Sequence, residues 1–230
     1  MAPPRPKSGS TSGKSDRTPS QSSLAERAAR QIVESIELRV LKPGEVLDFA
    51  ALSEAMNISR TPIRESVRKL QMDGLLEGLP GGQFRVVVLT PEKINDYYVV
   101  RTELEIAAAG LAARQILDEE LDMLKCNLEL FRDHIDRPDD LVRLDQQFHE
   151  IIYDATRNRY LRKRLSALRV ILGLLPVASY HDPQRTKGIL KEHKAIVATL
   201  ARHDAEAAQA AIRTHIEKAG VARAVADAET

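Results

Sequence analysis

The spacing of apolar residues predicts two helices at the start of the folded chain. Between residues 24 and 41 apolar positions recur every three or four residues, which is the period of one helix face. Pro43-Gly44 ends this segment. Asp48 is placed to cap a second helix that continues to Met56, and Asn57 can adopt the left-handed conformation that closes a helix.

A third helix and a hairpin are predicted next. The helix is expected to begin at Thr61-Pro62, with the threonine as cap and the proline at the first helical position, and to end at Gly74. Two strands over 75–79 and 84–89 enclose the turn Pro80-Gly81-Gly82. Two short helices followed by a hairpin predict a winged helix-turn-helix.

After Thr90 the pattern is helical throughout. The expected helices are 91–115, 118–134, 139–156, 158–175, 183–202 and 204–226. The fold class is therefore mainly α, with a winged helix-turn-helix domain at 23–89 and an all-α six-helix bundle at 90–230. Residues 1–22 hold almost nothing apolar and are expected to form a disordered tail.

Composition adds only modest constraints. No apolar stretch reaches the length of a membrane span, no secretory signal is recognisable, and the single cysteine, Cys126, fits a reducing cytoplasm. Residues 1–89 carry 13 Lys and Arg against 10 Asp and Glu, whereas residues 90–230 carry 21 against 23. The balances of +3 and −2 place the surplus of positive charge in the N-terminal half, as expected if that half meets phosphates.

The third helix has two distinct faces. Its apolar face carries Ile63, Val67 and Leu70. Arg64 and Arg68 lie one turn apart on another face, Arg60 precedes them, and Thr61 adds a hydroxyl near the helix start. Spaced arginines alone also occur on ordinary solvated helices. After a short helix and before a wing, they indicate contact with phosphates and guanine edges.

The sequence here resembles the GntR family of bacterial transcription regulators. The most specific match is Ser59-Arg60-Thr61-Pro62-Ile63-Arg64-Glu65, and the similarity covers about residues 24–89. The resemblance implies that Arg60, Thr61, Arg64 and Arg68 contact operator DNA. The wing departs from the family pattern of Arg followed by Gly, so Gln83 or Arg85 would have to supply its DNA contact.

Three of the six histidines are predicted to point inward. His193 and His215 interrupt apolar helix faces, and His149 follows Asp145 by four residues, which puts both on one face. Each could be a hydrogen-bonded core residue. Together, three imidazoles and one carboxylate suit Zn²⁺, Ni²⁺ or Mn²⁺ with coordination positions left open. The other histidines are expected at surfaces or helix ends: His134, His181 and His203.

The helical half resembles the FCD ligand-binding domain of the FadR subfamily, in its shorter VanR-like six-helix form. The matching stretches are Asp145-x-x-x-His149, Asn158-x-x-Leu161, Glu192-His193, Asp204-x-x-x-Ala208 and His215. The resemblance implies a metal on Asp145, His149, His193 and His215. Arg101, in Arg101-x-x-Leu104-Glu105, matches the arginine that grips an effector carboxylate, although a simple Arg101–Glu105 pair explains the spacing equally well.

These patterns predict a ligand-responsive transcription regulator, which we expect to be a repressor. It would be a cytoplasmic homodimer on operator DNA, modulated by a small carboxylate effector, and not an enzyme. Two alternatives remain: a constitutive regulator with a purely structural metal, and a metal-dependent hydrolase fused to a DNA-binding domain. The hydrolase lacks a clear general base, since Glu150 and Glu192 are expected to face solvent or to serve structure.

Overall fold

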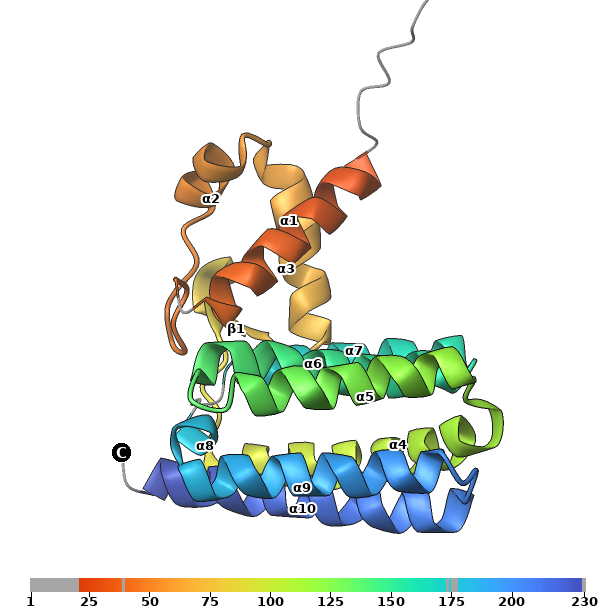
Figure 1. Cartoon of the computed structure of the whole chain (residues 1–230). Helices are drawn as coiled ribbons and strands as arrows, with labels where there is room; N and C mark the ends of the chain where they lie inside the picture. Colours follow the sequence, from red (N-terminus) through yellow and green to blue (C-terminus); the bar gives the residue numbers. More distant parts are fainter. Residues whose placement is uncertain (1–20, 39, 173, 175–177, 229–230) are drawn as a thin grey trace, which may run out of the picture.

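The computed structural model describes residues 21–38, 40–172, 174 and 178–228. Three helices and a hairpin form an N-terminal part that stands on a bundle of long helices (Figure 1). Most of the expected tail, 1–20, lies outside the described residues, and the first helix already begins at Gln21. Among the described residues, no helix combines the length and apolar character needed to cross a membrane.

The N-terminal part is a helical triad with a two-stranded wing. Its elements are α1 (Gln21–Glu37), α2 (Phe49–Met56), α3 (Arg60–Met72), β1 (Leu76–Leu79) and β2 (Gln83–Val86). Ala28, Ile32 and Ile36 on α1 are fully buried because their spacing of four keeps them on one face. They pack with the predicted apolar face of α3, including Ile63 and Val67, in a single core.

The turn between α2 and α3 forms as predicted, but α3 begins earlier. The Asp48 side chain accepts hydrogen bonds from the first turn of α2, and Asn57 adopts φ 50° and ψ 49° at its end. The N-cap of α3 is Ser59, in an extended conformation, so Thr61 and Pro62 lie inside the first turn. Proline is tolerated there because amide groups of the first turn have no intrahelical acceptor.

The wing is a short antiparallel hairpin. Leu76 pairs with Val86 and Leu79 with Gln83, and the turn between them places Gly81 and Gly82 at positive φ. The second strand begins one residue earlier than predicted and ends at Val86 instead of residue 89. Val46, shortly before α2, pairs with Arg85 of this strand through an isolated antiparallel bridge.

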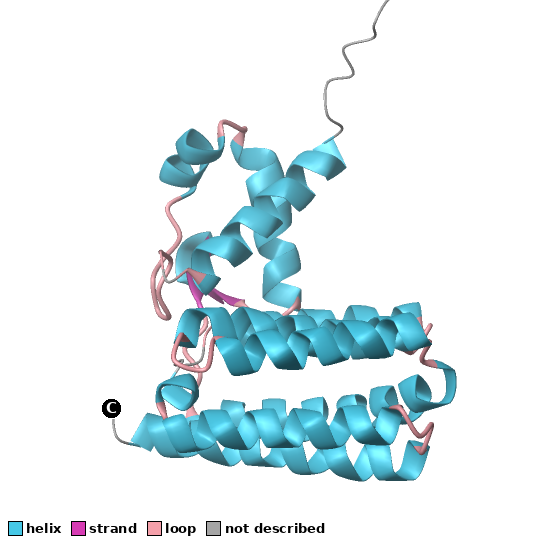
Figure 2. Ribbon diagram, in the orientation of Figure 1, coloured by secondary structure: helices cyan, strands magenta, loops and turns pink. Residues whose placement is uncertain are grey.

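The C-terminal part consists of the six predicted long helices and one short helix that was not predicted. They are α4 (Pro91–Gln115), α5 (Asp118–Asp133), α6 (Pro138–Ala155), α7 (Arg159–Leu172), α8 (Ala178–His181), α9 (Pro183–Leu200) and α10 (Ala205–Ala228). Figures 1 and 2 show α5, α6 and α7 as the layer nearer the N-terminal part, with α4, α9 and α10 beyond them. The core between them includes fully buried Phe131 and Phe148.

Helix α7 contributes to the cores of both parts. Near its start, Leu161 and Leu165 pack with Ala108 of α4 and Tyr153 of α6. At its end, Val170 and Ile171 join the apolar core of the N-terminal part. The two parts of the chain are therefore connected by packed side chains as well as by the backbone.

Replacing Asn57 tests the left-handed turn between α2 and α3. Asn57→Val should lower the free energy of unfolding by about 1–2 kcal/mol, because a β-branched residue is strained in that conformation. Asn57→Gly is the matched control and should fold with nearly unchanged stability. Urea denaturation measures both. Equal stability of the valine and wild-type proteins would show that this backbone conformation does not constrain the turn.

Candidate metal centre and nucleic-acid interface

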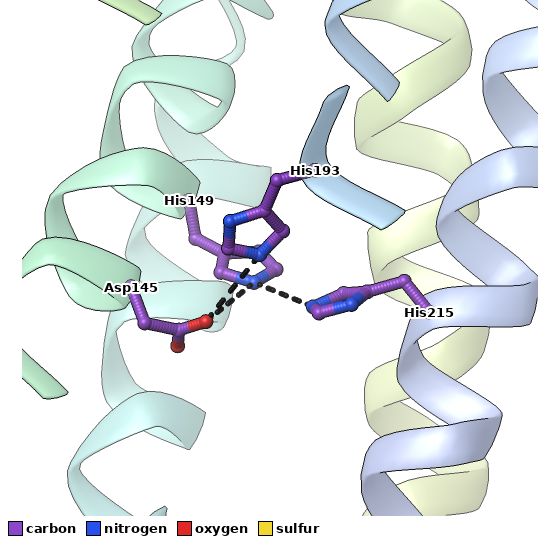
Figure 3. Close-up of side chains that lie close together, drawn as sticks. All are labelled: Asp145, His149, His193 and His215. Carbon is purple, nitrogen blue, oxygen red and sulfur yellow. Dashed lines mark hydrogen bonds and ion pairs between the residues drawn. The ribbon is translucent and has the colours of Figure 1, made fainter. Parts of the chain in front are cut away.

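Four predicted metal-ligand residues meet in the middle of the helical bundle. Asp145 and His149 come from α6, His193 from α9 and His215 from α10 (Figure 3). All four are buried, and one ligand atom from each lies within 4.8 Å of the others. The i, i+4 spacing places Asp145 and His149 on the same face of α6, which is turned toward α9 and α10.

The converging atoms are three imidazole Nε2 atoms and one carboxylate oxygen. Asp145 Oδ1 lies 3.4 Å from His193 Nε2 and 4.0 Å from His149 Nε2. The Nε2 atoms of His149 and His215 are 3.3 Å apart. The four atoms thus surround a common point, as the ligands of one ion do.

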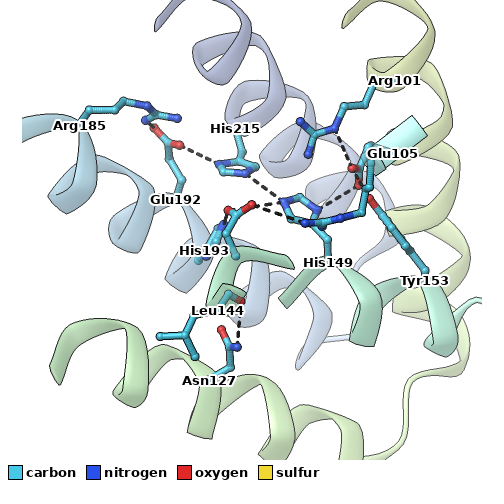
Figure 4. A network of polar contacts seen from close by, with 12 residues as sticks. Arg101, Glu105, Asn127, Leu144, His149, Tyr153, Arg185, Glu192, His193 and His215 are labelled. Atoms are coloured by element: carbon cyan, nitrogen blue, oxygen red, sulfur yellow. Dashed lines mark hydrogen bonds and ion pairs between the residues drawn. The ribbon is translucent and has the colours of Figure 1, made fainter. Parts of the chain in front are cut away.

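Two outer carboxylates orient two of these imidazoles. Glu105 Oε2 lies 3.3 Å from Nδ1 of His149, and Glu192 Oε2 lies 2.8 Å from Nδ1 of His215 (Figure 4). An ionised carboxylate can only accept, so both Nδ1 atoms carry the hydrogen. In the neutral imidazoles this leaves a bare lone pair on each Nε2, which is the form that binds metals.

The buried carboxylates stay ionised. Burial alone would raise the pKa of the Glu105 carboxyl, but His149, Arg101 and Tyr153 outweigh it and hold that pKa below its usual value. For Asp145 the histidines and Arg169 likewise overcome burial and hold its pKa well below the ordinary range. The pKa of Glu192 is about 2, because hydrogen bonds from His215 and Arg185 exceed the effect of burial.

Burial keeps His193 and His215 neutral. It lowers the pKa of His193 to about 3 and also lowers the pKa of His215. His193 is stacked on Phe148, with ring centroids 3.8 Å apart, and neither of its ring nitrogens has a hydrogen-bond partner. Unpartnered buried nitrogens of this kind are unfavourable unless a ligand satisfies them. The residues present therefore fit a divalent cation.

Arg101 lies beside the four-residue cluster. It is buried, and its Nε donates to Glu105 Oε1 at 3.2 Å, which is the simple i, i+4 pair that the spacing allowed. Tyr153 donates to the same oxygen at 2.5 Å. Arg101 also lines a cavity of about 20 Å³ together with Asp145, Arg185 and His215, and this space suits a single water-sized group.

The sequence did not reveal the outer partners of the cluster. Glu192 was expected to face solvent or to serve structure; it is partly buried and bonded to His215 and Arg185. Glu105 was considered only as a partner of Arg101, yet it also holds His149. Spacing could not identify the contacts with His149 and His215 because each joins two different helices. Glu150, the other carboxylate considered as a base, accepts from Ser166.

Helix-end positions account for several other residues of the helical half. Asn158 accepts hydrogen bonds from the first turn of α7, and Asp204 accepts one from the first turn of α10. His134, after α5, bonds the backbone carbonyl of Leu130, and His203, after α9, bonds the backbone carbonyl of Ala113 in α4, each at 2.9 Å. These two histidines thus occupy the helix ends where they were expected.

The predicted DNA-contacting residues of α3 lie on its exposed face. Arg60, Thr61, Arg64 and Arg68 are all exposed. The guanidinium of Arg64 lies 5.2 Å from the centre of the Phe49 ring, which restrains its direction without covering it. On the wing, Gln83 is exposed, whereas Arg85 is paired with Glu77 across the hairpin at 2.6 Å.

Comparisons with known proteins match both halves of the chain. Residues 24–86 match the bacterial regulatory proteins of the gntR family, and residues 96–218 match the FCD domain. The uncharacterised HTH-type transcriptional regulator YdhC of Bacillus subtilis is 31% identical over 177 residues, which cover 76% of this chain and 79% of the relative. The HTH-type transcriptional repressor RspR of Escherichia coli is 25% identical over 78% of this chain and 79% of its own length.

A solved structure has the same fold. E. coli McbR/YncC aligns with a TM-score of 0.77 at 22% identity, over 89% of this chain and 98% of its own. These regulators are named as HTH-type transcription regulators, not as enzymes. The chain therefore belongs to the FadR-type branch of the GntR family, as a DNA-binding transcription regulator with an FCD domain after its winged helix-turn-helix.

Proposed function

We propose that this protein is a ligand-responsive repressor whose helical domain holds a divalent metal ion and a small carboxylate effector. The DNA-binding domain would comprise residues 23–89 and the sensing domain residues 90–230. The metal, Zn²⁺, Ni²⁺ or Mn²⁺, would bind Asp145, His149, His193 and His215. The effector would weaken operator binding by favouring one arrangement of the bundle over another.

The metal proposal rests on the facing Nε2 atoms of His149 and His215. Both imidazoles carry their hydrogen on Nδ1, and their lone pairs are 3.3 Å apart in a buried core. Two lone pairs at this distance repel each other unless something positive lies between them. A proton between the two nitrogens would give one of the imidazoles a positive charge. Burial opposes this at His215, because it lowers the pKa of that residue. A metal ion removes the repulsion and also satisfies His193.

The effector proposal rests on the position of Arg101. Its guanidinium lines the same cavity as Asp145 and His215, so an anion there would meet the arginine and the metal together. A carboxylate is the simplest group that satisfies both. Because the cavity has a volume of about 20 Å³, an effector larger than a few atoms requires it to widen. The small volume is also what favours the alternative, a purely structural metal in a constitutive regulator.

The DNA proposal rests on the exposed face of α3. Arg64 and Arg68 would enter the major groove, with Arg60 and Thr61 near its phosphates. On the wing, Gln83 is the better-placed contact, since Arg85 would first have to leave Glu77. Acting as a homodimer, two such helices would recognise half-sites about one helical turn apart.

Removing two ligands should abolish metal binding. Chelator-treated protein reconstituted with Zn²⁺, Ni²⁺ or Mn²⁺ should retain about one ion per chain after dialysis, whereas His193→Ala combined with His215→Ala should retain essentially none. Elemental analysis by mass spectrometry measures the stoichiometry. His134→Ala, at a partly exposed histidine outside the cluster, is the control and should bind like the wild type. Stoichiometric metal in the double variant would refute the site.

The effector is tested by thermal stability. Metal-loaded protein should be stabilised by at least one acid in a panel of small carboxylates, and the chelated protein should not. Arg101→Gln should lower the affinity for that acid about 10- to 100-fold, because hydrogen bonds to charged groups contribute about 1.5–3 kcal/mol. The variant should still retain its metal. Equal stabilisation of the variant would exclude Arg101 from the effector site. If no acid stabilises any form, the constitutive alternative is favoured.

Arg64→Ala tests the recognition helix. Using an operator selected by the wild-type protein from random duplexes, the variant should bind about 10- to 100-fold more weakly, the loss of about 1–3 kcal/mol expected for a base contact. The free energy of unfolding of this variant should be unchanged, because Arg64 is exposed. Arg162→Ala, an exposed arginine of α7, is the matched control and should bind normally. A wild-type footprint from the Arg64 variant would show that α3 does not recognise DNA through this residue.

A further inference from the structure

Helix α7 contacts the metal cluster and the DNA-binding part with neighbouring residues. Arg169 is buried and directed at Asp145, one of the four candidate ligands. The next two residues, Val170 and Ile171, pack against the core that supports α3. A movement of this end of α7 therefore changes the contacts at both sites together.

The contact between Arg169 and Asp145 is close to the metal position. Arg169 Nη2 lies 4.0 Å from Asp145 Oδ2, while the other oxygen, Oδ1, faces His193 and His149. One carboxylate is thus shared between the arginine and the candidate metal position. The guanidinium is poorly satisfied, since its Nη1 is buried without a hydrogen-bond partner. A buried charge with a single long ion pair responds strongly to any change in its partner.

A carboxylate of the DNA-binding part lines the same cleft as Val170, the residue next to Arg169. A cleft of about 500 Å³ separates α1, α3 and α7, and Glu37 lines it together with Leu70 and Val170. Partial burial raises the pKa of Glu37, and the positive charge of Arg169 opposes this rise. Arg169 is therefore within electrostatic range of a carboxylate of the DNA-binding part, and the cleft leaves space for the two parts to approach.

We propose that Arg169 couples the metal centre to the DNA-binding domain by changing its preference between Asp145 and Glu37. This inference rests on the proposed metal site. A cation that takes up the charge of Asp145 weakens the attraction of that carboxylate for Arg169 and repels the guanidinium. Glu37 then becomes the stronger partner of Arg169. The resulting displacement of α7 changes the packing of Val170 and Ile171 against the core beneath α3. Binding at one site thereby changes the free energy of the other, and the effect is reciprocal.

Hydrogen exchange of the full-length protein tests this coupling without a known operator. Chelator-treated protein is compared with protein saturated with Zn²⁺, and exchange is followed on α6 and α9, which hold ligands, and on α1 and α3. In the wild type, Zn²⁺ should slow exchange on α6 and α9. It should also change exchange on α1 and α3 by about fivefold or more, the lower end of typical couplings.

Substitutions then separate coupling from metal binding. Arg169→Met should keep the response of α6 and α9 to Zn²⁺ and lose the response of α1 and α3. Arg169→Lys keeps the positive charge and should retain part of the response of α1 and α3 to Zn²⁺. Glu37→Gln, at an exposed residue outside the metal cluster, should reduce the response of α1 and α3 even if the Arg169→Met protein does not fold. Arg162→Met, on the exposed side of the same helix, should behave like the wild type.

The failures of the two proposals are distinguishable. If wild-type protein retains no Zn²⁺ and α6 and α9 do not respond, the metal site itself is wrong and the coupling fails with it. If α6 and α9 respond while α1 and α3 do not, the metal site stands and the coupling is refuted. Wild-type responses of α1 and α3 in both Arg169→Met and Glu37→Gln would also overturn the role of these residues.

Discussion

The packing of the helical domain depends on bringing three buried imidazoles and a carboxylate to one point. The Nε2 atoms of His149 and His215 face each other at 3.3 Å, and His193 directs its own Nε2 at Asp145. The helices that carry them, α6, α9 and α10, can pack this closely only if the lone pairs are satisfied. A bound ion would therefore stabilise the packing of these three helices.

The charges around the cluster are arranged in matched sets. Each of three carboxylates lies beside a histidine and an arginine: Glu105 with His149 and Arg101, Glu192 with His215 and Arg185, and Asp145 with His193 and Arg169. Asp145 also lies near His149, and Glu192 also pairs with Lys218. The three carboxylates and three arginines balance in charge, and Lys218 adds a positive charge beside Glu192. A divalent cation would add two more positive charges to this region. An anionic ligand would reduce this positive charge, which agrees with the proposed carboxylate effector.

The three arginines differ in what their surroundings connect to the cluster. Arg101 and Arg185 line the cavity beside the cluster, whereas Arg169 lies on α7, which shares its end with the DNA-binding part. The same kind of ion pair therefore serves different purposes according to the packing of its helix. Two of these arginines face the space available to a ligand, and the third connects the cluster to the core beneath α3.

The sequence determined the helices, the helix-turn-helix with its Asp48 and Asn57 caps, the exposed arginines of α3 and the four residues of the metal cluster. These features follow from local periodicity, capping chemistry and residue type, supported by the family motif. Only the tertiary structure decided the exact start of α3, the shorter second strand, the short helix α8, the outer carboxylates Glu105 and Glu192, and the position of Arg169 between the two parts. The partners of Glu105, Glu192 and Arg169 lie on other helices or turns of the bundle, and local spacing carries no information about which distant side chains will meet.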